Sequence, residues 1–575
     1  MGIAGFTYPT SDLPLSKAPP TSCTGGPRNP PARAIGSQSV ARWSEVPEFL
    51  PRRCRLTAVG YGLSVPVRCL LAVVGGLVLA AAFEPIGHAW LMPPAIAVLV
   101  LTVRGLRPGL AWIPGLLFGI AFTFAVMVWM RAVGTDAWIA MCSLEAAFFV
   151  PLGIGLSWSL RARAWPVLAA LWWVGVETWR SGFPFSGMPF GRLVFATADT
   201  PWADAIPWIG MTGASFLVAL TGTTLAWLLL QLRTPTRATY AAVAALAVVT
   251  FAPVLVTFPV HESGTTTVAA VQGDVPGTGL DVPSVHREVT ANHVRLTVEL
   301  ADAVAAGEER QPDFVVWPEN STAVDPFVDT EVHEGIIAAS HAIGVPVIVG
   351  GMSNDPLDDT QVLNQGIVYQ PGLGSGDRYT KRHPVPYGEY IPFRGSIIPS
   401  NYGKLATIPR DMVRGTSLEP LRVGDVRVAD AICFDVAYDE GIGGQVARGA
   451  ELVTVQTSNA MFSRTGQLAQ QFEISRLRAL ETGRWVVVAA INGISGVVRP
   501  DGTVVASVPA RGQEVLVETV GLSTTTTPAV RLGVWPARLT LLFLVAHAAV
   551  VLITYRRRRR GDRPSAESAE QGEPT

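Results

Sequence analysis

Cysteine is scarce in this chain, with five residues among 575. An odd number without a Cys-x-x-Cys spacing argues against a disulfide framework and a zinc site, and we expect neither metal nor cofactor. Four of the five lie in the N-terminal tail or in apolar segments: Cys23, Cys54, Cys69 and Cys142. Cys433 is the only thiol in the polar half. It could simply be a small buried hydrophobic residue, but the acidic and aromatic residues after it suit a strand end that opens into a site.

Lysine is scarcer still, because only three of the 44 basic residues are lysines: Lys17, Lys381 and Lys404. Arginine is a planar, permanently charged fork, whereas lysine is a compact donor with a tunable pKa, so a site that needs the compact donor resists replacement. We interpret Lys381 as such a site residue. Lys17 lies in a tail, and Lys404 is expected to be an ordinary exposed loop residue. Chance survival of three lysines is the alternative.

Charged residues make up only 15% of the chain and hydrophobic residues 49%, with a net charge of -1. This balance argues against nucleic-acid binding and indicates membrane spans. A membrane-spanning helix needs about 20 apolar residues, a little fewer when the bilayer adjusts. Eight apolar segments approach or reach that length, near residues 67–83, 89–103, 109–130, 137–160, 164–180, 210–232, 237–257 and 533–555.

The arginines predict the orientation of these spans. With a cytoplasmic N-terminus, the inner connections hold Arg52, Arg53, Arg55, Arg104, Arg107, Arg161, Arg163, Arg233, Arg237 and the run Arg556 to Arg560. The outer connections hold only Arg131, Arg180 and Arg192. This bias fits the positive-inside rule for eight spans with both termini inside. Arg52-Arg53 could also belong to an export signal, but no small-residue cleavage site follows, which favours a cytoplasmic flank.

The spans divide the chain into five predicted parts. Residues 1–60, rich in Pro, Ser, Gly and Arg, are expected to be a disordered cytoplasmic tail. Residues 61–260 are expected to form a membrane domain with seven transmembrane helices, and residues 531–555 the eighth. Between them, residues 261–530 form an extracytoplasmic domain. Residues 556–575 are a basic, then disordered, cytoplasmic tail.

The extracytoplasmic domain alternates β-rich runs with helical stretches, which indicates an α/β layered fold. The predicted strands are Thr266–Val271, Phe314–Trp317, Val345–Gly350, Gly366–Tyr369, Val426–Cys433, Leu452–Val455, Trp485–Asn492 and Val515–Val520. The predicted helices are Val285–Ala306, Val332–Ile343 and Gln467–Thr482. Asp501-Gly502 predicts a hairpin turn between Gly496-Val-Val and Thr503-Val-Val.

Three predicted strand ends of this domain carry side chains that could act together in one reaction. The runs are Phe314-Val-Val-Trp-Pro-Glu319, Tyr379-Thr-Lys381 and Val428-Ala-Asp-Ala-Ile-Cys433. A thiol beside a carboxylate that can take its proton, with a lysine to hold developing negative charge, is suited to acyl transfer through a thioester. These three motifs therefore indicate the class of reaction but not its substrate.

Further motifs accompany these three: Val271-Gln-Gly-Asp-Val-Pro276, Pro386-Tyr-Gly-Glu389-Tyr-Ile-Pro392, Thr457-Ser-Asn459, Arg478-Ala-Leu-Glu-Thr-Gly483, Gly182-Phe-Pro-Phe-Ser-Gly187 and Trp208-Ile-Gly-Met-Thr-Gly213. In combination, over about residues 65–555, the chain resembles the apolipoprotein N-acyltransferase family, the membrane branch of the nitrilase superfamily. The resemblance implies a multi-span α-helical membrane domain and a nitrilase-like αββα sandwich.

The resemblance also implies roles for single residues. Glu319 would be the general base, Lys381 the transition-state stabiliser and Cys433 the nucleophile. A second, supporting carboxylate would be Glu389, while Phe434 and Asp435 would line the site beside the nucleophile. Two stretches depart from the family pattern. Gly279-Leu280-Asp281 stands where the family often has a tryptophan, and Ala460-Met461-Phe462 replaces an Asp-Ala-Trp-Phe run. These departures concern lipid contacts rather than the chemistry.

The implied reaction moves an acyl chain from a membrane phospholipid to Cys433, and then to the α-amine of a diacylglyceryl-cysteine at a lipoprotein N-terminus. The implied location is the bacterial cytoplasmic membrane, with the catalytic domain on its extracytoplasmic face. Relatives sometimes act beside, or fused to, a polyprenol-phosphate mannosyltransferase, so a separate enzyme of that kind is an expected partner.

Two other functions stay open on the sequence alone. The same three residues would serve a membrane-anchored amidase or nitrilase with water in place of the amine, and a degenerate domain would leave a membrane scaffold. The apolar outer loop Phe183–Phe190 favours the transferase if it admits lipid, but it could equally be an interfacial anchor.

Overall fold

The computed structural model describes residues 62–232, 234–277, 282, 285–395, 405–406 and 408–561. Several positions discussed above lie outside these ranges: the N-terminal tail with Lys17, Cys23, Cys54 and the arginines near residue 52, then Arg233, Leu280, Lys404 and the C-terminal tail. Residues Thr57–Thr575 form one compact unit.

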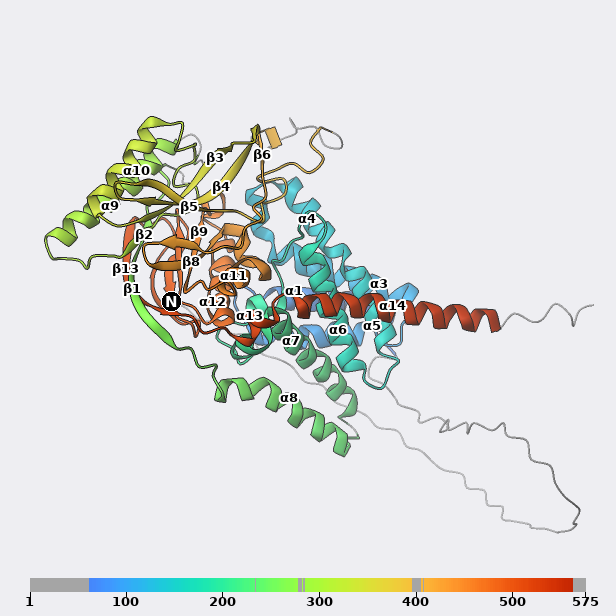
Figure 1. Cartoon of the computed structure of the whole chain (residues 1–575). Coiled ribbons are helices and arrows are strands. Elements are labelled where there is room, and N and C mark those ends of the chain that lie inside the picture. Colours follow the sequence, from blue (N-terminus) through green and yellow to red (C-terminus); the bar gives the residue numbers. More distant parts are fainter. Residues whose placement is uncertain are drawn as a thin grey trace, which may run out of the picture. The chain divides into compact units, whose positions relative to one another are not determined.

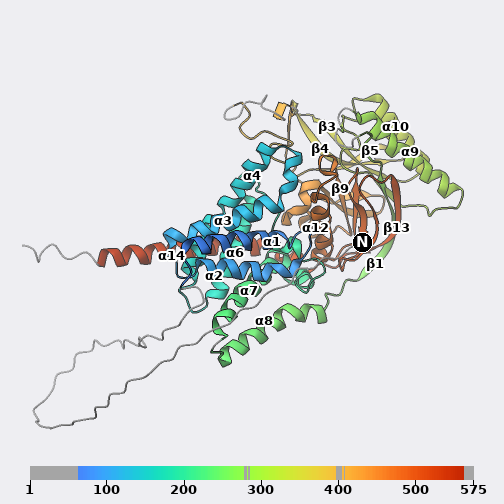
Figure 2. The same cartoon turned by 180° about the vertical axis from the view of Figure 1, so that it is seen from behind.

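Each of the predicted apolar segments is largely helical. The helices are α1 (Val65–Ala80), α2 (Met92–Val103), α3 (Pro108–Val126), α4 (Thr135–Ala147), α5 (Phe149–Ser159), α6 (Trp165–Gly182), α7 (Ile206–Gln231), α8 (Arg237–Leu255) and α14 (Trp535–Gly561). Helices α4 and α5 together correspond to the single segment predicted near residues 137–160. In Figures 1 and 2, α8 lies apart from the other membrane helices, and only 11% of its apolar window is buried.

Within the described residues, five helical stretches are long and apolar enough to cross a membrane: α3, α4 with α5, α7 with the turn before it, α8 and α14. Helices α1 and α2 are apolar but shorter than this length. Helix α6 carries two buried charged residues, Glu177 and Arg180. The chain is therefore a membrane protein by its helices, although only some of the eight predicted spans meet the length and composition on their own.

Small residues let these helices pack closely. A Cβ on Gly76 of α1 would lie 2.4 Å from the carbonyl oxygen of Phe118 in α3. Likewise, a Cβ on Gly115 of α3 would lie 2.4 Å from the carbonyl oxygen of Phe149 in α5. Glycine at these positions allows the backbones to approach, as is typical of helix packing in membranes.

The strands of the described residues form two sheets. The first has the order β13-β1-β2-β3-β4-β5, with β6 paired to β4, and the second has the order β12-β11-β10-β9-β8-β7. The strands of the first sheet are β1 (Glu262–Gln272), β2 (Phe314–Val316), β3 (Val347–Asp355), β4 (Asp358–Gln370), β5 (Gly374–Thr380), β6 (Asp411–Met412) and β13 (Glu514–Ser523). Those of the second are β7 (Leu421–Val423), β8 (Val426–Ile432), β9 (Leu452–Thr457), β10 (Val486–Ala490), β11 (Ser495–Val498) and β12 (Val504–Val508).

Helices cover the outer face of each sheet. α9 (His286–Ala305) and α10 (Thr330–Ile343) lie on one side of the strands, and α11 (Asp439–Val446) and α12 (Gln467–Thr482) on the other (Figure 1). One apolar core lies between the sheets and joins residues such as Val316 to Ile432, while a second lies under α9 and α10. This is the predicted αββα sandwich beside a helical membrane part, so the fold class is confirmed.

The apolar core on the α12 side does not stop at the sandwich. Buried residues of α12 and the second sheet, including Ile474 and Leu477, belong to the same cluster as the buried residues of α1 to α7. Near this junction a short α13 (Pro528–Leu532) precedes α14 and contacts α7. The membrane helices and the α11–α12 layer therefore share one continuous core.

Candidate active site

The three predicted residues each follow a strand. Glu319 lies three residues after β2, Lys381 directly after β5, and Cys433 directly after β8. The β2 and β5 strands belong to the first sheet and β8 to the second, so the site lies between the edges of the two sheets.

Lys381 is fully buried between two carboxylates. Its Nζ donates to Glu319 Oε1 at 2.9 Å and to Glu389 Oε1 at 2.6 Å. Burial by itself lowers the pKa of Lys381, but the charges of Glu319 and Glu389 outweigh it and hold this pKa well above the ordinary value. The ammonium is therefore charged at every physiological pH and is available to stabilise an oxyanion.

Glu319 is held by groups from both sheets. The Asn364 side-chain amide donates to its Oε1 at 2.7 Å, and the Ser458 backbone N–H donates to its Oε2 at 2.7 Å. A Cβ on Gly350 would lie 2.2 Å from the carbonyl oxygen of Pro318. Only glycine therefore allows β3 to lie this close to the segment that carries Glu319. The carboxylate is thus fixed by its surroundings rather than free to rotate.

Cys433 opens a short 3-10 turn at the end of β8 and has a φ of 51°. A non-glycine residue in this left-handed region is strained, and such strain is typical of functional sites. Burial raises the pKa of the Cys433 thiol to about 12, the charge of Glu319 adds to the rise, and Lys381 opposes it. The thiol is therefore protonated at neutral pH and needs a base in order to attack.

Glu389 completes the charge cluster. Its second oxygen accepts from the Val385 backbone N–H at 2.9 Å. Burial raises the pKa of Glu389, and the charge of Glu319 adds to the rise, while Lys381 lowers it. The predicted supporting carboxylate is thus in direct contact with the predicted lysine.

Asp435 contacts the segment that carries Lys381. It accepts from the Tyr379 hydroxyl at 2.9 Å and from the backbone N–H groups of Arg382 and His383 at 3.1 and 2.7 Å. Burial alone raises the pKa of Asp435, but hydrogen bonding and charge from His383 bring it below the usual value. Asp435 therefore fastens the turn of the nucleophile to the segment that carries Lys381.

Phe434 faces the membrane part of the chain. Its ring stacks on that of Phe190 with centroids 6.1 Å apart and an angle of 7°, and it also contacts Tyr438. The Tyr438 hydroxyl donates to the Gly187 carbonyl at 3.2 Å. The loop Phe183–Phe190 thus lies against the residues next to the proposed nucleophile.

A chain of buried and half-buried charges joins the same regions, and we call it the ionic chain: Glu177, Arg192, Asp439, Arg478 and Glu481. Arg192 donates to both oxygens of Asp439 at 2.8 and 3.1 Å, and Arg478 donates to Asp439 at 3.1 Å. Burial raises the pKa of Asp439, but the two arginines bring it down to about 2. The pairing of these residues was not predicted, because they are up to about 300 positions apart and arginine is common throughout the protein.

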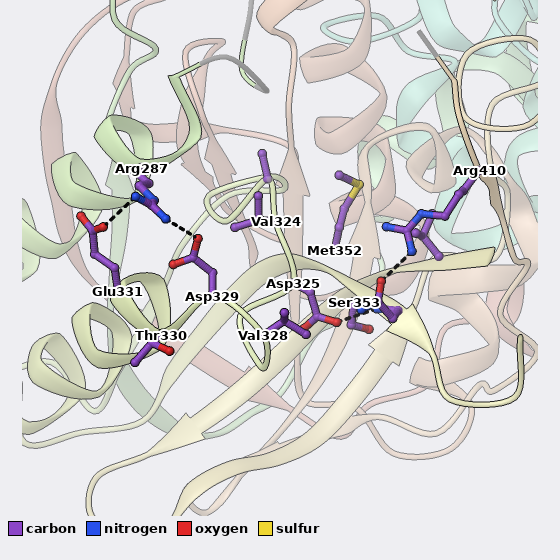
Figure 3. A pocket seen from close by; sticks show the side chains of 13 residues that line it. Arg287, Val324, Asp325, Val328, Asp329, Thr330, Glu331, Met352, Ser353 and Arg410 are labelled. Atoms are coloured by element: carbon purple, nitrogen blue, oxygen red, sulfur yellow. Dashed lines mark hydrogen bonds and ion pairs between the residues drawn. The ribbon is translucent and has the colours of Figure 1, made fainter. Parts of the chain in front are cut away.

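A separate polar cavity of about 740 Å³ lies beside β3 and the start of α10 (Figure 3). Its described lining is Arg287, Ala323, Val324, Asp325, Val328, Asp329, Thr330, Glu331, Met352, Ser353, Asn354, Val362 and Arg410. Arg287 pairs with Asp329 and Glu331, at 3.2 and 3.1 Å, and Arg410 donates to the Asn354 side chain at 2.6 Å. None of the predicted site residues belongs to this lining. Within the described ranges, no group of three His, Cys, Asp or Glu could hold a metal ion.

Some solved structures are similar to part of this chain. They include the NitFhit protein of C. elegans, with 17% identity, a TM-score of 0.34 and coverage of 45% of this chain and 62% of that one. Another is Nit3 of Saccharomyces cerevisiae, a nitrilase superfamily member, with 17% identity, a TM-score of 0.33 and coverage of 45% and 91%.

Sequence comparisons cover most of the chain. Residues 75–224 match the model of the apolipoprotein N-acyltransferase N-terminal domain, and residues 267–528 match the carbon-nitrogen hydrolase model. The apolipoprotein N-acyltransferase of Mycolicibacterium smegmatis is 34% identical over 86% of this chain and 86% of its own. That of Methylococcus capsulatus is 30% identical over 88% of this chain and 99% of its own. This chain belongs to the apolipoprotein N-acyltransferase family and is an acyltransferase.

Proposed function

We propose that this enzyme transfers an acyl chain from a phospholipid to the α-amine of a diacylglyceryl-cysteine at a lipoprotein N-terminus, through a thioester on Cys433. The observation that carries the proposal is the buried Lys381–Glu319 ion pair at 2.9 Å, whose charges act on the Cys433 thiol. Family membership supports the choice of substrates, because a lipid donor and a lipoprotein acceptor are implied by the relatives' names.

In the first half-reaction, Cys433 sulfur attacks the ester carbonyl of the phospholipid while Glu319 takes the thiol proton. The C–S bond forms, and the carbonyl electrons move to oxygen, where the Lys381 ammonium stabilises them. When the carbonyl re-forms, the ester C–O bond breaks, and Glu319 returns its proton to the departing lysophospholipid alkoxide. The acyl chain stays on Cys433 as a thioester.

In the second half-reaction, the acceptor amine attacks the thioester carbonyl. The C–N bond forms, Glu319 takes a proton from the nitrogen, and Lys381 again stabilises the oxyanion. The C–S bond then breaks, and the thiolate recovers its proton from Glu319. In this scheme Glu389 holds Lys381 in place, and Asp435 aligns the turn that carries Cys433 with the segment that carries Lys381. Phe434 joins the site to the loop Phe183–Phe190.

This activity predicts a specific chemical difference in cells. The N-terminal peptide of a lipoprotein should carry a third, amide-linked acyl chain in cells that express this protein, and only two acyl chains in cells that lack it. Mass spectrometry of that peptide checks the result. Two-chain peptides in both strains, with an amidase activity in the expressing strain, would favour the hydrolytic alternative.

We further propose the cytoplasmic membrane as the location, with both termini inside and residues 261–530 outside as the catalytic domain. Residues 61–260 and 531–555 would then be the membrane domain and the last span. Two of the outer arginines support this orientation, because their charges are paired internally. Arg180 donates to Glu145 at 2.9 Å, and Arg192 pairs with Asp439. A separate polyprenol-phosphate mannosyltransferase as partner rests on the family resemblance alone.

The orientation can be tested with reporter insertions at two exposed turns. Leu357, between β3 and β4, is 94% exposed, and Arg161, between α5 and α6, is also exposed. An alkaline phosphatase that folds only after export should be active at Leu357 and inactive at Arg161. The reverse pattern would refute the proposed orientation, and activity at both positions would refute a single topology.

A further inference from the structure

Three consecutive residues at and just after the end of β9, Gln456, Thr457 and Ser458, lie next to the proposed active site. β8 and β9 are parallel with Ile432 opposite Gln456, which places the next residues, Cys433 and Thr457, side by side. The Gln456 side chain donates to the Trp317 carbonyl at 2.5 Å, and Ser458 N–H donates to Glu319. Thr457, between them, lowers the pKa of the Cys433 thiol, against the larger effect of burial.

The Thr457 hydroxyl makes two hydrogen bonds in the structure. It donates to Asn459 Oδ1 at 3.1 Å and accepts from Gln471 Nε2 at 3.0 Å. A hydroxyl has one hydrogen and two lone pairs. In the resting site its hydrogen therefore points to Asn459, and one of its lone pairs accepts from Gln471.

The surrounding amides fix this arrangement. Asn459 Nδ2 donates to Gln467 Oε1 at 3.0 Å and to Gln471 Oε1 at 2.8 Å, and Gln467 Nε2 donates to the same oxygen of Gln471 at 2.6 Å. All four side chains are buried. With its nitrogen committed to two acceptors, Asn459 must present its oxygen to Thr457.

We propose that Thr457 is a further catalytic residue, whose hydroxyl turns its hydrogen from Asn459 Oδ1 to the Cys433 sulfur when that sulfur becomes a thiolate. The inference rests on the proposed role of Cys433 as nucleophile. The proton of the thiol still goes to Glu319, and Thr457 neither gains nor loses a proton. Only its single hydrogen bond changes acceptor, and it returns to Asn459 when the thioester has formed.

The direction of the switch follows from charge. A hydrogen bond to an ionised acceptor is about twice as strong as a neutral one, so Asn459 holds the hydrogen against a neutral thiol and loses it to a thiolate. The other groups that act on Cys433 are charged: Glu319 and Glu389 oppose the thiolate and Lys381 favours it. Thr457 adds a neutral donor that responds to the sulfur without competing with Lys381 for the substrate oxyanion.

The test measures the thiolate directly in the full-length protein. Iodoacetamide alkylation of Cys433 is followed against pH by mass spectrometry of the Cys433 peptide, for the wild type, Thr457→Val and Thr457→Ser. A charged hydrogen bond is worth about 10–100-fold, so Thr457→Val should slow alkylation at a fixed pH by that factor and move the pH profile upward. Thr457→Ser keeps the hydroxyl and should remain within about threefold of wild type.

A second variant predicts the opposite sign. Asn459→Ala removes the competing acceptor, so the hydroxyl should donate to sulfur permanently and the alkylation profile should move to lower pH. Thr482→Val, which removes a buried hydroxyl that donates to the Arg478 carbonyl, is the matched control and should leave the profile unchanged. Equal alkylation profiles for Thr457→Val and Thr457→Ser would overturn the inference.

The proposed function can fail separately from this inference. If phospholipid leaves no acyl mass on wild-type Cys433, the acyltransfer scheme is wrong, while the alkylation profiles still report whether Thr457 stabilises the thiolate. If both hold, Thr457→Val should also slow formation of the acyl-enzyme, by about the same factor as alkylation, and Thr457→Ser should restore it.

Discussion

Replacement of Cys433 by alanine is expected to remove the acyl-enzyme and to lower acyl transfer by at least about 10³-fold, because no other nucleophile can take the acyl chain in the first half-reaction. Wild-type protein incubated with phospholipid should gain the mass of one acyl chain, which neutral hydroxylamine removes as it cleaves thioesters. Cys433→Ala should gain none. Intact-protein mass spectrometry under single-turnover conditions measures both.

The matched control is Cys69→Ala, which removes a half-buried thiol of α1 far along the chain from the proposed site. It should form the adduct and transfer the chain like wild type, and we expect the other cysteines to tolerate Ala or Ser as well. An acyl adduct that persists in Cys433→Ala would show that Cys433 is not the nucleophile.

Arginine in place of Lys381 is expected to be nearly as damaging as alanine, with a loss of about 10²–10³ in rate for each. The lysine is fully buried, and its Nζ fits between Glu319 and Glu389 at 2.9 and 2.6 Å. A guanidinium keeps the charge but is larger and planar, so it would overfill this space and direct its donors away from the oxyanion. Acyl transfer at matched expression measures the effect.

The same chemical change elsewhere is the control. Lys404→Arg should leave acyl transfer unchanged, on the expectation from sequence that Lys404 is an ordinary loop residue. Near-normal activity of Lys381→Arg would show that Lys381 supplies only charge, and the inference from the scarcity of lysine would fail. Loss of activity in both variants, with normal folding, would show that the control position is also needed.

The parts of the fold with a clear periodicity were predictable. Helix α12 spans the predicted residues Gln467–Thr482, and α9 lies within one residue of its prediction at each end. The hairpin of β11 and β12 follows Asp501-Gly502 as expected. Strand β5 was missed because Gly374–Thr380 holds two glycines and charged residues, and its pairing with β4 forms the strand instead.

The proposed site residues stand out in the sequence for a different reason. Glu319 and Cys433 each follow an apolar run that ends at the end of a strand, and a rare residue type marks Lys381 and Cys433. What the sequence could not show is the second layer of contacts. Asp435 bonds to the Tyr379 hydroxyl and to backbone groups more than 50 positions earlier, and Phe190 contacts Phe434 from 244 positions away. Such contacts depend on how the two parts of the chain pack, which no local pattern encodes.

The ionic chain bears on whether the catalytic half could ever exist as a soluble enzyme. Excision of residues 261–530 would leave Asp439 bonded to Arg478 but remove both of its hydrogen bonds from Arg192. Each charged hydrogen bond contributes about 1.5–3 kcal/mol to the free energy of unfolding. Excision would also uncover the apolar face that α12 shares with the membrane helices. Against a total stability of about 5–15 kcal/mol for a typical domain, these losses are large. A water-soluble form would therefore need a redesigned surface around Asp439 and α12, and simple truncation would not supply one.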